Sequence, residues 1–445
     1  MRKYFSALIM IVVIAGCKGK SELKPELVLT NNNVLLPTIK FSVEEKADYN
    51  IKYWSENNPE RIQVSTTSTG IDHTIVLANV KSETKYNYVI YNKITKKQSQ
   101  TFSFQTGPLP FDIITTKKKA IDTTLFDGFI LIRKVAPVGS DVILDNEGDV
   151  VWYHLYDTAV RRPSSWTKQN TILSIYDSSH IVEYDLFGKA LINMKLEDYG
   201  IPNMIHHDIL YNDNQEIVSL THDSVKMDLR KLGMGANELV RADGIIVLTK
   251  EGQVKWKWNL LEVYNPLDYP KRKINLKHSL GHANSIAIDN DGHYVISFRD
   301  FSQLWKINSV DGSVIWKLGE GGDFSLTKEN VFLKQHAIYF NEKHELMFFD
   351  NGDRSLRPNS RILSFDIDEK LMQAKTVTDI TLPLELSADK MCSAEMIKDN
   401  LYLVCTSKKS GIVSVVNDRA EVLWRVDLTS PSYRAYYLPN PFEVK

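Results

Sequence analysis

The 445-residue sequence predicts an all-β protein, a six-bladed β-propeller preceded by a small N-terminal β-sandwich. Two patterns predict this fold. One hairpin signature recurs six times between residues 142 and 424, and internal repetition of this kind is typical of propellers. Before it, short segments alternate apolar and polar residues with a period of two, as the strands of a sandwich do.

Composition and charge exclude several classes of protein. The chain is 43% apolar and 24% charged, which fits neither a disordered chain nor a polytopic membrane protein. Its 54 basic and 55 acidic residues leave a net charge of −1, so bulk charge cannot drive binding to phosphates and no nucleic-acid partner is expected. Three cysteines are too few for a disulfide framework.

The first residues have the pattern of a lipoprotein signal peptide, predicted over residues 1–16. Arg2 and Lys3 precede an apolar run from Leu8 to Ile14 that is too short to span a bilayer, and Ile14-Ala15-Gly16-Cys17 has the form of a bacterial lipobox. A short N-terminal anchor helix is the alternative. We expect lipidation at Cys17, a polar tether over residues 17–24, and an extracytoplasmic protein anchored to a bacterial membrane, in the periplasm or at the outer membrane.

Residues 25–107 are predicted to form the β-sandwich. The stretch from Leu77 to Tyr88 resembles the corner of a fibronectin type III-like sandwich, where a tyrosine ties a strand to its preceding loop. Gly107-Pro108-Leu109-Pro110 is predicted to be a linker. We interpret this domain as a spacer or docking module. The alternating segments occur at residues 38–43, 49–54, 73–77 and 86–91.

Residues 108–445 are predicted to form the propeller. Each copy of the repeated signature is an apolar strand, a turn, and a strand that ends in an aromatic or aliphatic residue. The copies span residues 142–152, 181–191, 246–256 and 304–316, with two degenerate copies at 362–372 and 413–424. Their turn positions (148, 188, 252, 312, 369 and 420) are 40, 64, 60, 57 and 51 residues apart. Such periods suit four-stranded blades with loops of variable length.

A second hairpin precedes the better copies and supplies the inner strands of the blades. Aligned by their turns, residues 207–214, 284–291 and 336–343 place His207, Asn284 and His336 at one blade position, immediately before the innermost strand. Because that strand lines the central channel of a propeller, these residues are predicted to lie at the channel mouth.

Histidines gather at these positions. Histidine suits nucleophilic or acid–base chemistry near neutral pH, and Arg299, at the end of a nearby strand, offers planar charged donors for a tetrahedral oxyanion. A lone histidine is more often structural, but repetition at equivalent positions favours a functional cluster. Its members are His206, His207, His282 and His336.

The ordered set of motifs resembles the bacterial arylsulfate sulfotransferases. The motifs are Ile205-His206-His207-Asp208-Ile209, Gly281-His282-Ala283-Asn284-Ser285, Ser297-Phe298-Arg299-Asp300, Gln335-His336-Ala337 and Phe349-Asp350-Asn351-Gly352. The resemblance covers nearly the whole mature chain, and the ending from Ser432 to Tyr436 looks like the family's last strand, which closes the propeller against the first blade.

The resemblance implies a function. Members of this family move a sulfuryl group from an aryl sulfate donor to a phenolic acceptor through a sulfated histidine, without a nucleotide sulfate donor, a metal or another cofactor. Carried over by motif, His336 is the nucleophile. His207, His282 and Arg299 join it as catalytic residues that hold the sulfuryl oxygens and handle the phenol proton. Asn284 and His206 are assigned to substrate binding.

The chain departs from the family pattern at its cysteines. Many members carry a close-spaced cysteine pair beside the active site, whereas Cys392 and Cys405 flank a hairpin of the last blade. These two could pair in an oxidising compartment or remain free thiols. His207 is preferred over His206 as the residue facing the channel, because the register aligns it with His336. A homodimer is left open.

Two other functions are compatible with the residues. The first is a metal-dependent hydrolase with three histidine ligands, with Asp208 and Asp350 adjacent to the motifs. The second is a non-catalytic extracytoplasmic propeller that binds a glycan or a protein partner at the same mouth.

Overall fold

The computed structural model describes residues 23–30, 33–66, 69–160, 162–202, 204–268, 279–408 and 410–442. The predictions for residues 1–16 and Cys17 lie outside the described residues. Contacts divide the chain into two compact units, one made mainly of residues 38–76 and 85–104 and the other mainly of residues 105–445. The predicted boundary between residues 107 and 108 stays a prediction.

The first unit contains two sheets. One is β1 (Glu26–Leu29), β2 (Pro37–Ala47) and β5 (Gly70–Val76), and the other is β4 (Asn58–Thr66), β3 (Tyr49–Ser55), β6 (Lys85–Asn92) and β7 (Phe102–Gln105). Phe41 of β2 meets Tyr49 of β3 edge-on, with ring centroids 5.5 Å apart, and His73 of β5 stacks on Phe41. The two sheets therefore pack on each other through aromatic side chains, which is the arrangement that a sandwich requires.

The second unit is built from six antiparallel sheets of four main strands. The first three comprise β33 (Ser432–Leu438), β9 (Phe129–Lys134), β10 (Ser140–Leu144) and β11 (Val150–Leu155); β12 (Ser164–Trp166), β13 (Thr171–Asp177), β14 (His180–Asp185) and β15 (Ala190–Lys195); and β16 (Met204–Tyr211), β17 (Ile217–Met227), β18 (Glu238–Leu248) and β19 (Val254–Asn259). A two-residue strand, β20 (Ser279–Leu280), pairs in parallel with β18.

The other three sheets follow in chain order. They comprise β21 (Ala283–Ile288), β22 (Tyr294–Phe298), β23 (Gln303–Ile307) and β24 (Val314–Gly319); β25 (His336–Phe340), β26 (Leu346–Asp350), β27 (Arg361–Asp368) and β28 (Gln373–Thr381); and β29 (Ser393–Lys398), β30 (Leu401–Thr406), β31 (Ile412–Asn417) and β32 (Val422–Leu428), with β8 (Thr116–Ala120) added at the outer edge. Each sheet reads in chain order from its inner to its outer strand, except where β33 and β8 enter.

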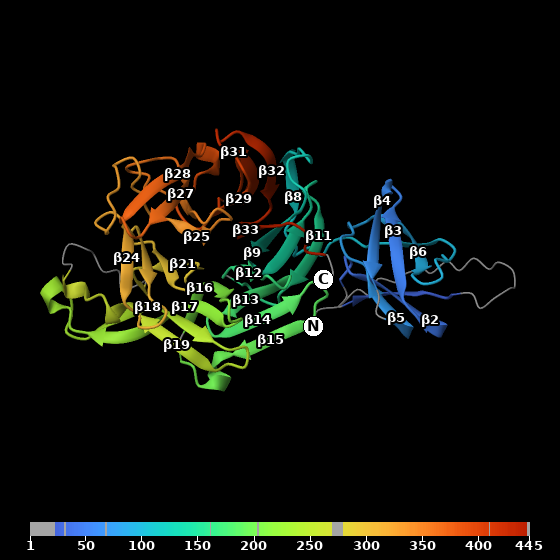
Figure 1. Ribbon diagram of the computed structural model, residues 1–445, viewed down its shortest axis with the longest axis horizontal. Coiled ribbons are helices and arrows are strands. Elements are labelled where there is room, and N and C mark those ends of the chain that lie inside the picture. The colour runs from blue at the N-terminus through green and yellow to red at the C-terminus, as the bar shows by residue number, and fades with distance from the viewer. Residues whose placement is uncertain are drawn as a thin grey trace. The chain divides into compact units, whose positions relative to one another are not determined.

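The inner strands of successive sheets contact one another. The pairs in contact are β12 with β16, β16 with β21, β21 with β25, β25 with β29, and β29 with β33. In Figure 1 these strands lie toward a common centre of this unit, whereas β15, β19, β24 and β28 lie at its periphery. Residues that begin or end an inner strand therefore come together although they are far apart in the sequence.

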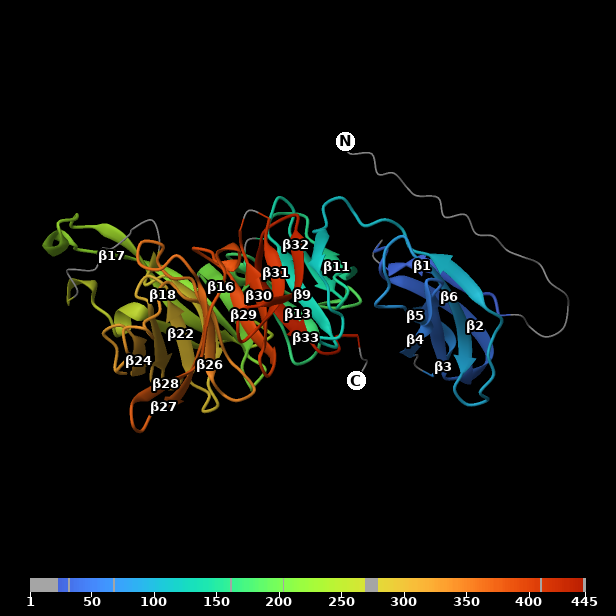
Figure 2. The same cartoon turned by 90° about the horizontal axis from the view of Figure 1, so that it is seen from above.

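The last strand of the second unit pairs with its first sheet, and the first strand pairs with its last sheet. C-terminal β33 pairs with β9 of the first sheet, as we expected for the last strand (Figure 2). N-terminal β8 pairs with β32 of the last sheet. Both ends of the chain segment are thus held by ladder hydrogen bonds.

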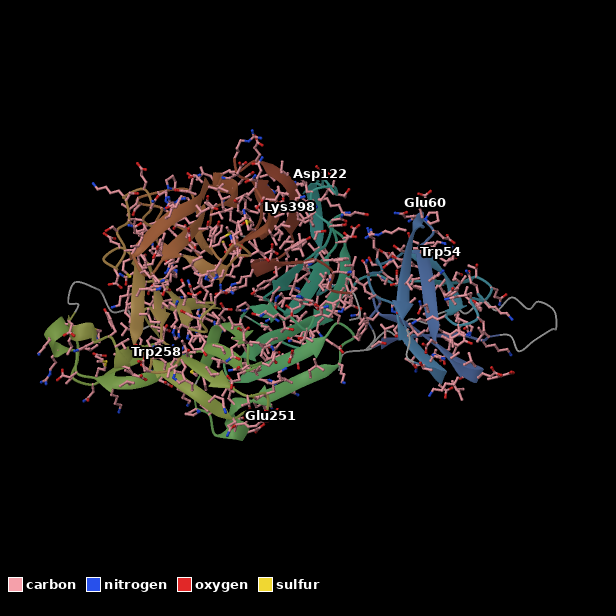
Figure 3. All side chains as sticks on the ribbon, in the orientation of Figure 1. Trp54, Glu60, Asp122, Glu251, Trp258 and Lys398 are labelled. Carbon is pink, nitrogen blue, oxygen red and sulfur yellow. The ribbon has the colours of Figure 1, made fainter. Side chains whose placement is uncertain are left out.

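Tryptophans of the outer strands link one sheet to the next. Trp152 Nε1 donates to the Leu186 carbonyl at 2.6 Å, and Trp424 Nε1 of the last sheet donates to the Asn146 carbonyl of the first at 2.9 Å. In the third sheet the bond comes from Trp258 (labelled in Figure 3), two residues beyond the Trp256 of the repeat signature. A buried indole N–H needs an acceptor, so these bonds specify which turn each strand meets.

The predicted turns are correct in five of the six copies. Gly148, Gly188, Gly252, Gly312 and Ala420 all have positive φ, the conformation that favours glycine. In the fifth copy the positive φ falls at Met372 rather than at position 369, because β27 runs on to Asp368 and pairs there with Gln373. The Glu369 carboxylate instead accepts from Trp316 Nε1 at 2.8 Å.

The apolar core lies between neighbouring sheets. One cluster joins Leu173 and Ile181 of the second sheet to Ile205 and Ile246 of the third, and further clusters lie between later pairs of sheets. Strands buried on both faces, such as β26, explain the continuous apolar runs in the sequence. The described helices are the short 3-10 turns η2 (Leu196–Tyr199), η3 (Arg230–Leu232), η4 (Leu260–Glu262), η5 (Pro266–Asp268) and η6 (Leu384–Leu386). Among the described residues, none of the helices could cross a membrane.

Candidate active site

The inner strands bring the predicted histidines together. His206 and His207 lie in β16, His282 immediately precedes β21, and His336 begins β25. The rings of His207 and His282 lie 5.2 Å apart, and His336 interacts electrostatically with both His207 and His282. Residues separated by up to 130 positions therefore share one site, as the resemblance implied.

A β-bulge interrupts each of these inner strands at the site. His206 pairs with Leu220 and His336 pairs with Phe349, and the ladder is irregular immediately after each of them. His207 lies inside its bulge with φ 56°, whereas in β25 it is Ala337 that has φ 54°. The predicted equivalence of His207 and His336 therefore holds as a count from the turn, but in the ladder His336 matches His206, because the bulge in β16 contains one residue more.

Left-handed backbone conformations gather around this cluster. Non-glycine residues rarely adopt positive φ, and strained residues concentrate at functional sites. Besides His207 and Ala337, the segments that form the site contain four such residues: His282, Lys334, Met391 and Cys392.

The His336 ring is held in one orientation. Its Nδ1 lies 2.6 Å from Asn351 Oδ1 and 3.0 Å from the Lys334 carbonyl, both of which are acceptors. Asn351 cannot be turned round, because its Nδ2 donates to the Ala388 carbonyl at 2.7 Å. The hydrogen-bond network thus assigns the proton to Nδ1 and leaves the lone pair on Nε2.

Nε2 of His336 meets one weak donor. The Met391 backbone N–H donates to it at 3.3 Å. Burial, with the nearby Arg299 as the second cause, lowers the pKa of His336 to about 3, so the ring is neutral near neutral pH. A neutral imidazole with a fixed, lightly engaged Nε2 lone pair is what a nitrogen nucleophile requires.

Arg299 supplies a cation beside His336. Its side chain is 21% exposed, and its guanidinium donates to Asp300 Oδ1 at 3.0 Å and to the Asp389 carbonyl at 3.4 Å. These contacts leave it partly open to solvent. A positive charge so placed can stabilise an anionic group that approaches Nε2.

Asn284 is engaged with the protein. Its Nδ2 donates to the Gln335 carbonyl at 2.7 Å, and Gln335 is fixed in turn by its amide, which donates to Ser297 Oγ at 3.0 Å. In this structure Asn284 therefore holds the segment that leads into His336. Its predicted contact with a substrate stays a prediction.

His206 faces Asp243 of β18. Its Nδ1 lies 2.7 Å from Nδ1 of His207, and its Nε2 lies 3.5 Å from Asp243 Oδ1. Burial lowers the pKa of both histidines well below the usual value, and it raises the pKa of Asp243 to about 8. His207 is thus the member of the pair that lies against His282.

The C-terminal strand closes against this site. Arg434 of β33 is buried and donates to Asp208 Oδ1 at 3.0 Å and to the Asn284 carbonyl at 3.2 Å. Asp208, in turn, accepts from the Ile286 N–H at 3.1 Å. The carboxylate beside the histidine pair is therefore used in an ion pair that ties β33 to β16 and β21.

Sequence reasoning missed four residues of the site. Arg162 interacts electrostatically with His206 and His207 from the segment before β12, and Met391 offers its N–H to His336. Asp243 looks like an ordinary strand residue in the sequence. Asn351 belongs to the motif Phe349-Asp350-Asn351-Gly352, but its role follows only from its contact with His336.

Cys392 and Cys405 are both buried free thiols in this structure. Burial raises the pKa of Cys392 to about 11 and that of Cys405 further, so neither is a reactive thiolate near neutral pH.

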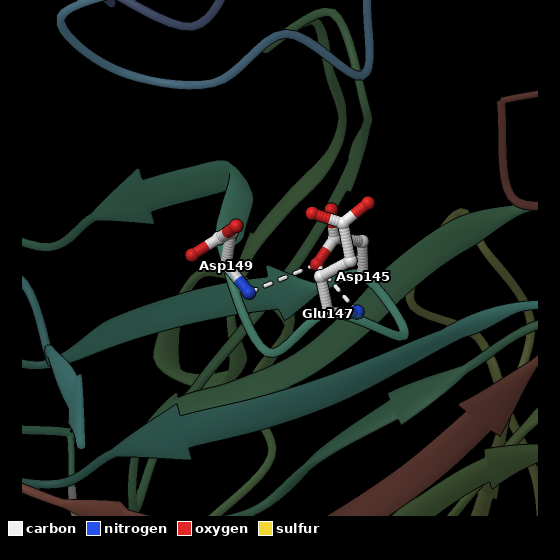
Figure 4. Close-up of side chains that lie close together, drawn as sticks. All are labelled: Asp145, Glu147 and Asp149. Carbon is white, nitrogen blue, oxygen red and sulfur yellow. Dashed lines mark hydrogen bonds between the residues drawn. The ribbon is translucent and has the colours of Figure 1, made fainter. Parts of the chain in front are cut away.

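Two acidic clusters lie elsewhere among the described residues. One is Asp145, Glu147 and Asp149 (Figure 4), and the other is Asp289, Asp291 and Glu369. Lys81 Nζ lies 2.5–3.1 Å from all three carboxylates of the first, and Lys306 Nζ lies 2.5–2.7 Å from all three of the second. A lysine therefore provides the counter-charge of each cluster.

The solved structures that resemble this chain include distant likenesses. A protein of unknown function from Bacteroides caccae is 10% identical, with 70% of this chain and 99% of that chain covered and a TM-score of 0.45. A catalytically inactive virginiamycin B lyase from Staphylococcus aureus with quinupristin is 9% identical, with 71% and 99% covered and a TM-score of 0.36. Likenesses with TM-scores this low give no information about the activity of this chain. Among curated proteins, none matches the chain.

A family model matches much more of the chain than any single motif does. It is the model of Arylsulfotransferase (ASST), and it matches residues 114–434, which is more than half of the chain and includes every residue of the histidine cluster. The chain therefore belongs to the arylsulfotransferase family.

Proposed function

We propose that this protein moves a sulfuryl group from an aryl sulfate ester to a phenolic acceptor through a sulfohistidine at His336, without a nucleotide sulfate donor. The observation that carries the proposal is the His336 ring, neutral and held by Asn351 with its lone pair on Nε2. Family membership supports sulfotransfer as the reaction class.

The site residues have the roles that such a transfer needs. Nε2 of His336 attacks sulfur, the bond from sulfur to the phenolic oxygen breaks, and the Met391 N–H gives up its weak contact with Nε2. Throughout the reaction the proton stays on Nδ1 of His336, which donates it in the hydrogen bond to Asn351 Oδ1. Charge develops on the sulfuryl oxygens and on the departing phenolate, so the fixed cation of Arg299 lowers the barrier. In the second half-reaction an acceptor phenol attacks the same sulfur and releases His336.

A transfer assay tests the proposal. Beyond the first equivalent per enzyme, release of 4-nitrophenol from 4-nitrophenyl sulfate should require an acceptor phenol, and His336→Ala should abolish all release. His344→Ala is the matched control, because His344 is a partly exposed histidine of the turn after β25. Repeated turnover without an acceptor would point to a hydrolase, and release that a chelator abolishes would point to a metal enzyme; either result contradicts the proposal.

We also propose that the six sheets are the blades of a closed six-bladed propeller, with the sandwich before it. Support comes from the contacts between successive inner strands and from the Trp424 bond that joins the last sheet to the first. Ending the chain after Pro431 removes β33 and the Arg434–Asp208 ion pair. That truncation should abolish cooperative unfolding and transfer together, and a truncated protein that keeps both would contradict ring closure.

For localisation we propose a lipid anchor at Cys17, from the lipobox pattern. Cys17→Ala should give a protein that keeps its signal segment and carries no lipid. Mature-sized Cys17→Ala protein that still pellets with membranes would overturn this proposal.

A further inference from the structure

Two buried polar atoms beside the site face each other without hydrogen-bond partners. They are Nε2 of His206 and Oδ1 of Asp243, 3.5 Å apart, on side chains that are only 2% and 1% exposed. An unpaired buried polar atom is costly, and catalytic hydrogen bonds are often long in a structure without substrate. A hydrogen bond between these two atoms would satisfy both.

The other nitrogen of His206 continues the chain of contacts. Nδ1 of His206 and Nδ1 of His207 lie 2.7 Å apart, a distance that places one proton between them. The nitrogen that remains on the His207 ring is Nε2. A chain of contacts thus runs from the carboxyl group in β18 through His206 to the His207 ring, which lies against His282 and interacts electrostatically with His336.

The histidines by themselves are poor acceptors for a phenol proton. Burial lowers the pKa of His206 and His207 well below the usual value, and the pKa of His336 is lowered to about 3. Asp243 is the opposite case, because burial raises its pKa to about 8. A proton that arrives at His207 is therefore more stable on Asp243 than on either imidazole.

We propose that Asp243, His206 and His207 form a proton relay in which Asp243 holds the proton that the departing phenolate takes up in the donor half-reaction and that the acceptor phenol returns in the second half-reaction. The relay rests on the proposed function. His207 touches the reacting oxygen, whereas His206 and Asp243 are positioning residues that act through it.

The proton count balances in both directions. In the donor half-reaction, His207 Nε2–H protonates the departing phenolate, His206 Nδ1–H passes its proton to His207 Nδ1, and the Asp243 carboxyl passes its proton to His206 Nε2. A carboxylate and two neutral imidazoles remain. In the acceptor half-reaction each transfer reverses, as the phenolic oxygen attacks sulfur and its proton enters at His207 Nε2. No step leaves a charged imidazolium in the relay.

Most of the surrounding groups favour this distribution of charge, whereas a backbone hydrogen bond at Thr221 favours the charged form of His206. Arg162 acts on both His206 and His207, His222 lies beside His206 with ring centroids 4.8 Å apart, and each of these opposes a positive charge on the imidazoles. His282 acts on both imidazoles in the same sense, and His336 acts on His207.

Asp243 has surroundings of mixed effect. Oδ2 of Asp243 accepts from the Ala283 N–H at 2.8 Å, and the carboxylate also receives hydrogen bonds from Ser279 and the His282 backbone, which favour the charged form. Burial and the neighbouring Asp300 favour the protonated form. The two forms are therefore balanced closely enough for the carboxyl group to exchange a proton.

The test compares two donors that differ in their need for a proton. The rate of sulfohistidine formation is measured by rapid quench and mass spectrometry with phenyl sulfate, whose basic phenolate needs protonation, and with 4-nitrophenyl sulfate, whose leaving group does not. Asp243→Asn cannot store a proton. It should slow the reaction of phenyl sulfate by about 10²–10⁴-fold and that of 4-nitrophenyl sulfate by less than about tenfold.

A second variant and a control keep the test decisive. His206→Gln retains Asp243 but interrupts the path, and it should show the same donor dependence even if Asp243→Asn fails to fold. Glu183→Gln replaces a buried carboxylate that accepts from Tyr211, and it should behave as the wild type does. Equal slowing of both donors, or no slowing, in His206→Gln would overturn the relay. Absence of an adduct from either donor in the wild type would instead overturn the sulfotransfer proposal on which the relay rests.

Discussion

The two sides of the histidine cluster are built differently. His336 is bound by neutral acceptors, Asn351 Oδ1 and a backbone carbonyl, so its proton has nowhere to go. His207 is bound by another histidine, which faces a carboxyl group, so its proton can move. The same residue type is thus prepared for two tasks: a fixed lone pair suits a nucleophile, and an exchangeable proton suits an acid–base group.

Removing the group that fixes the His336 ring should have the largest effect on the rate of sulfohistidine formation. Asn351→Leu removes the acceptor that sets the His336 tautomer, and loss of a tautomer-fixing partner is known to cost up to about 10⁴-fold in rate. We expect sulfohistidine formation to fall by about 10²–10⁴-fold, equally for phenyl and 4-nitrophenyl sulfate. Rapid-quench mass spectrometry measures both. A donor-dependent loss would place Asn351 on the proton-transfer side and remove the distinction.

Asn351→Asp sharpens the same distinction through pH. A carboxylate beside Nδ1–H raises the pKa of His336, which burial now holds at about 3. The rate of adduct formation in this variant should therefore fall as pH falls from about 8 to about 5, because the protonated ring has no lone pair. The wild-type His336 gives no such fall in this range, and matching profiles would show that Asn351 does not control the ring.

Arg299 should have a smaller effect that spares the nucleophile. Arg299→Gln removes one fixed cation, which by analogy with other lost transition-state donors costs about 2.7–4 kcal/mol, or about 10²–10³-fold in rate. The adduct should still form, slowly, on His336. Arg354→Gln is the control, because Arg354 is a more exposed arginine that contacts Asp389, the residue whose carbonyl also meets Arg299. Equal losses in the two variants would remove the special role of Arg299.

The two sides should also affect stability with opposite signs. His336 has a lower pKa folded than its ordinary 6.5, so the unfolded chain takes up a proton first and stability falls as pH falls below that value. Asp243 has a higher pKa folded than its ordinary 3.8, so its contribution is lost as pH rises toward about 8.

Urea unfolding across this pH range checks the signs, and these effects are the smallest. His336→Gln should flatten the acid side of the stability profile, and Asp243→Asn should flatten the alkaline side. If both variants flatten the same side, the two groups are not titrating as their surroundings indicate.

The sequence predicts the repeated strands of this protein better than the contacts within its histidine cluster. Repetition made the hairpins predictable, because each copy must bury its faces against the next sheet. The closing strand was predictable from the family resemblance of its sequence. The bulges that separate His207 from His336 in conformation were not readable, since a count from the turn is blind to an extra residue in the ladder. The role of Asp243 could not be predicted either, because it depends on contact with His206, which lies 37 positions earlier in another strand.

The central claim is that His336 carries the sulfuryl group, and intact-protein mass after exposure to donor alone tests it most directly. The account predicts a gain of about 80 Da, the mass of SO₃, that maps to His336, is discharged by an acceptor phenol, and is absent from His336→Ala. An adduct that persists in His336→Ala and maps to His207 or His282, or transfer at full rate with no adduct in any variant, would contradict it.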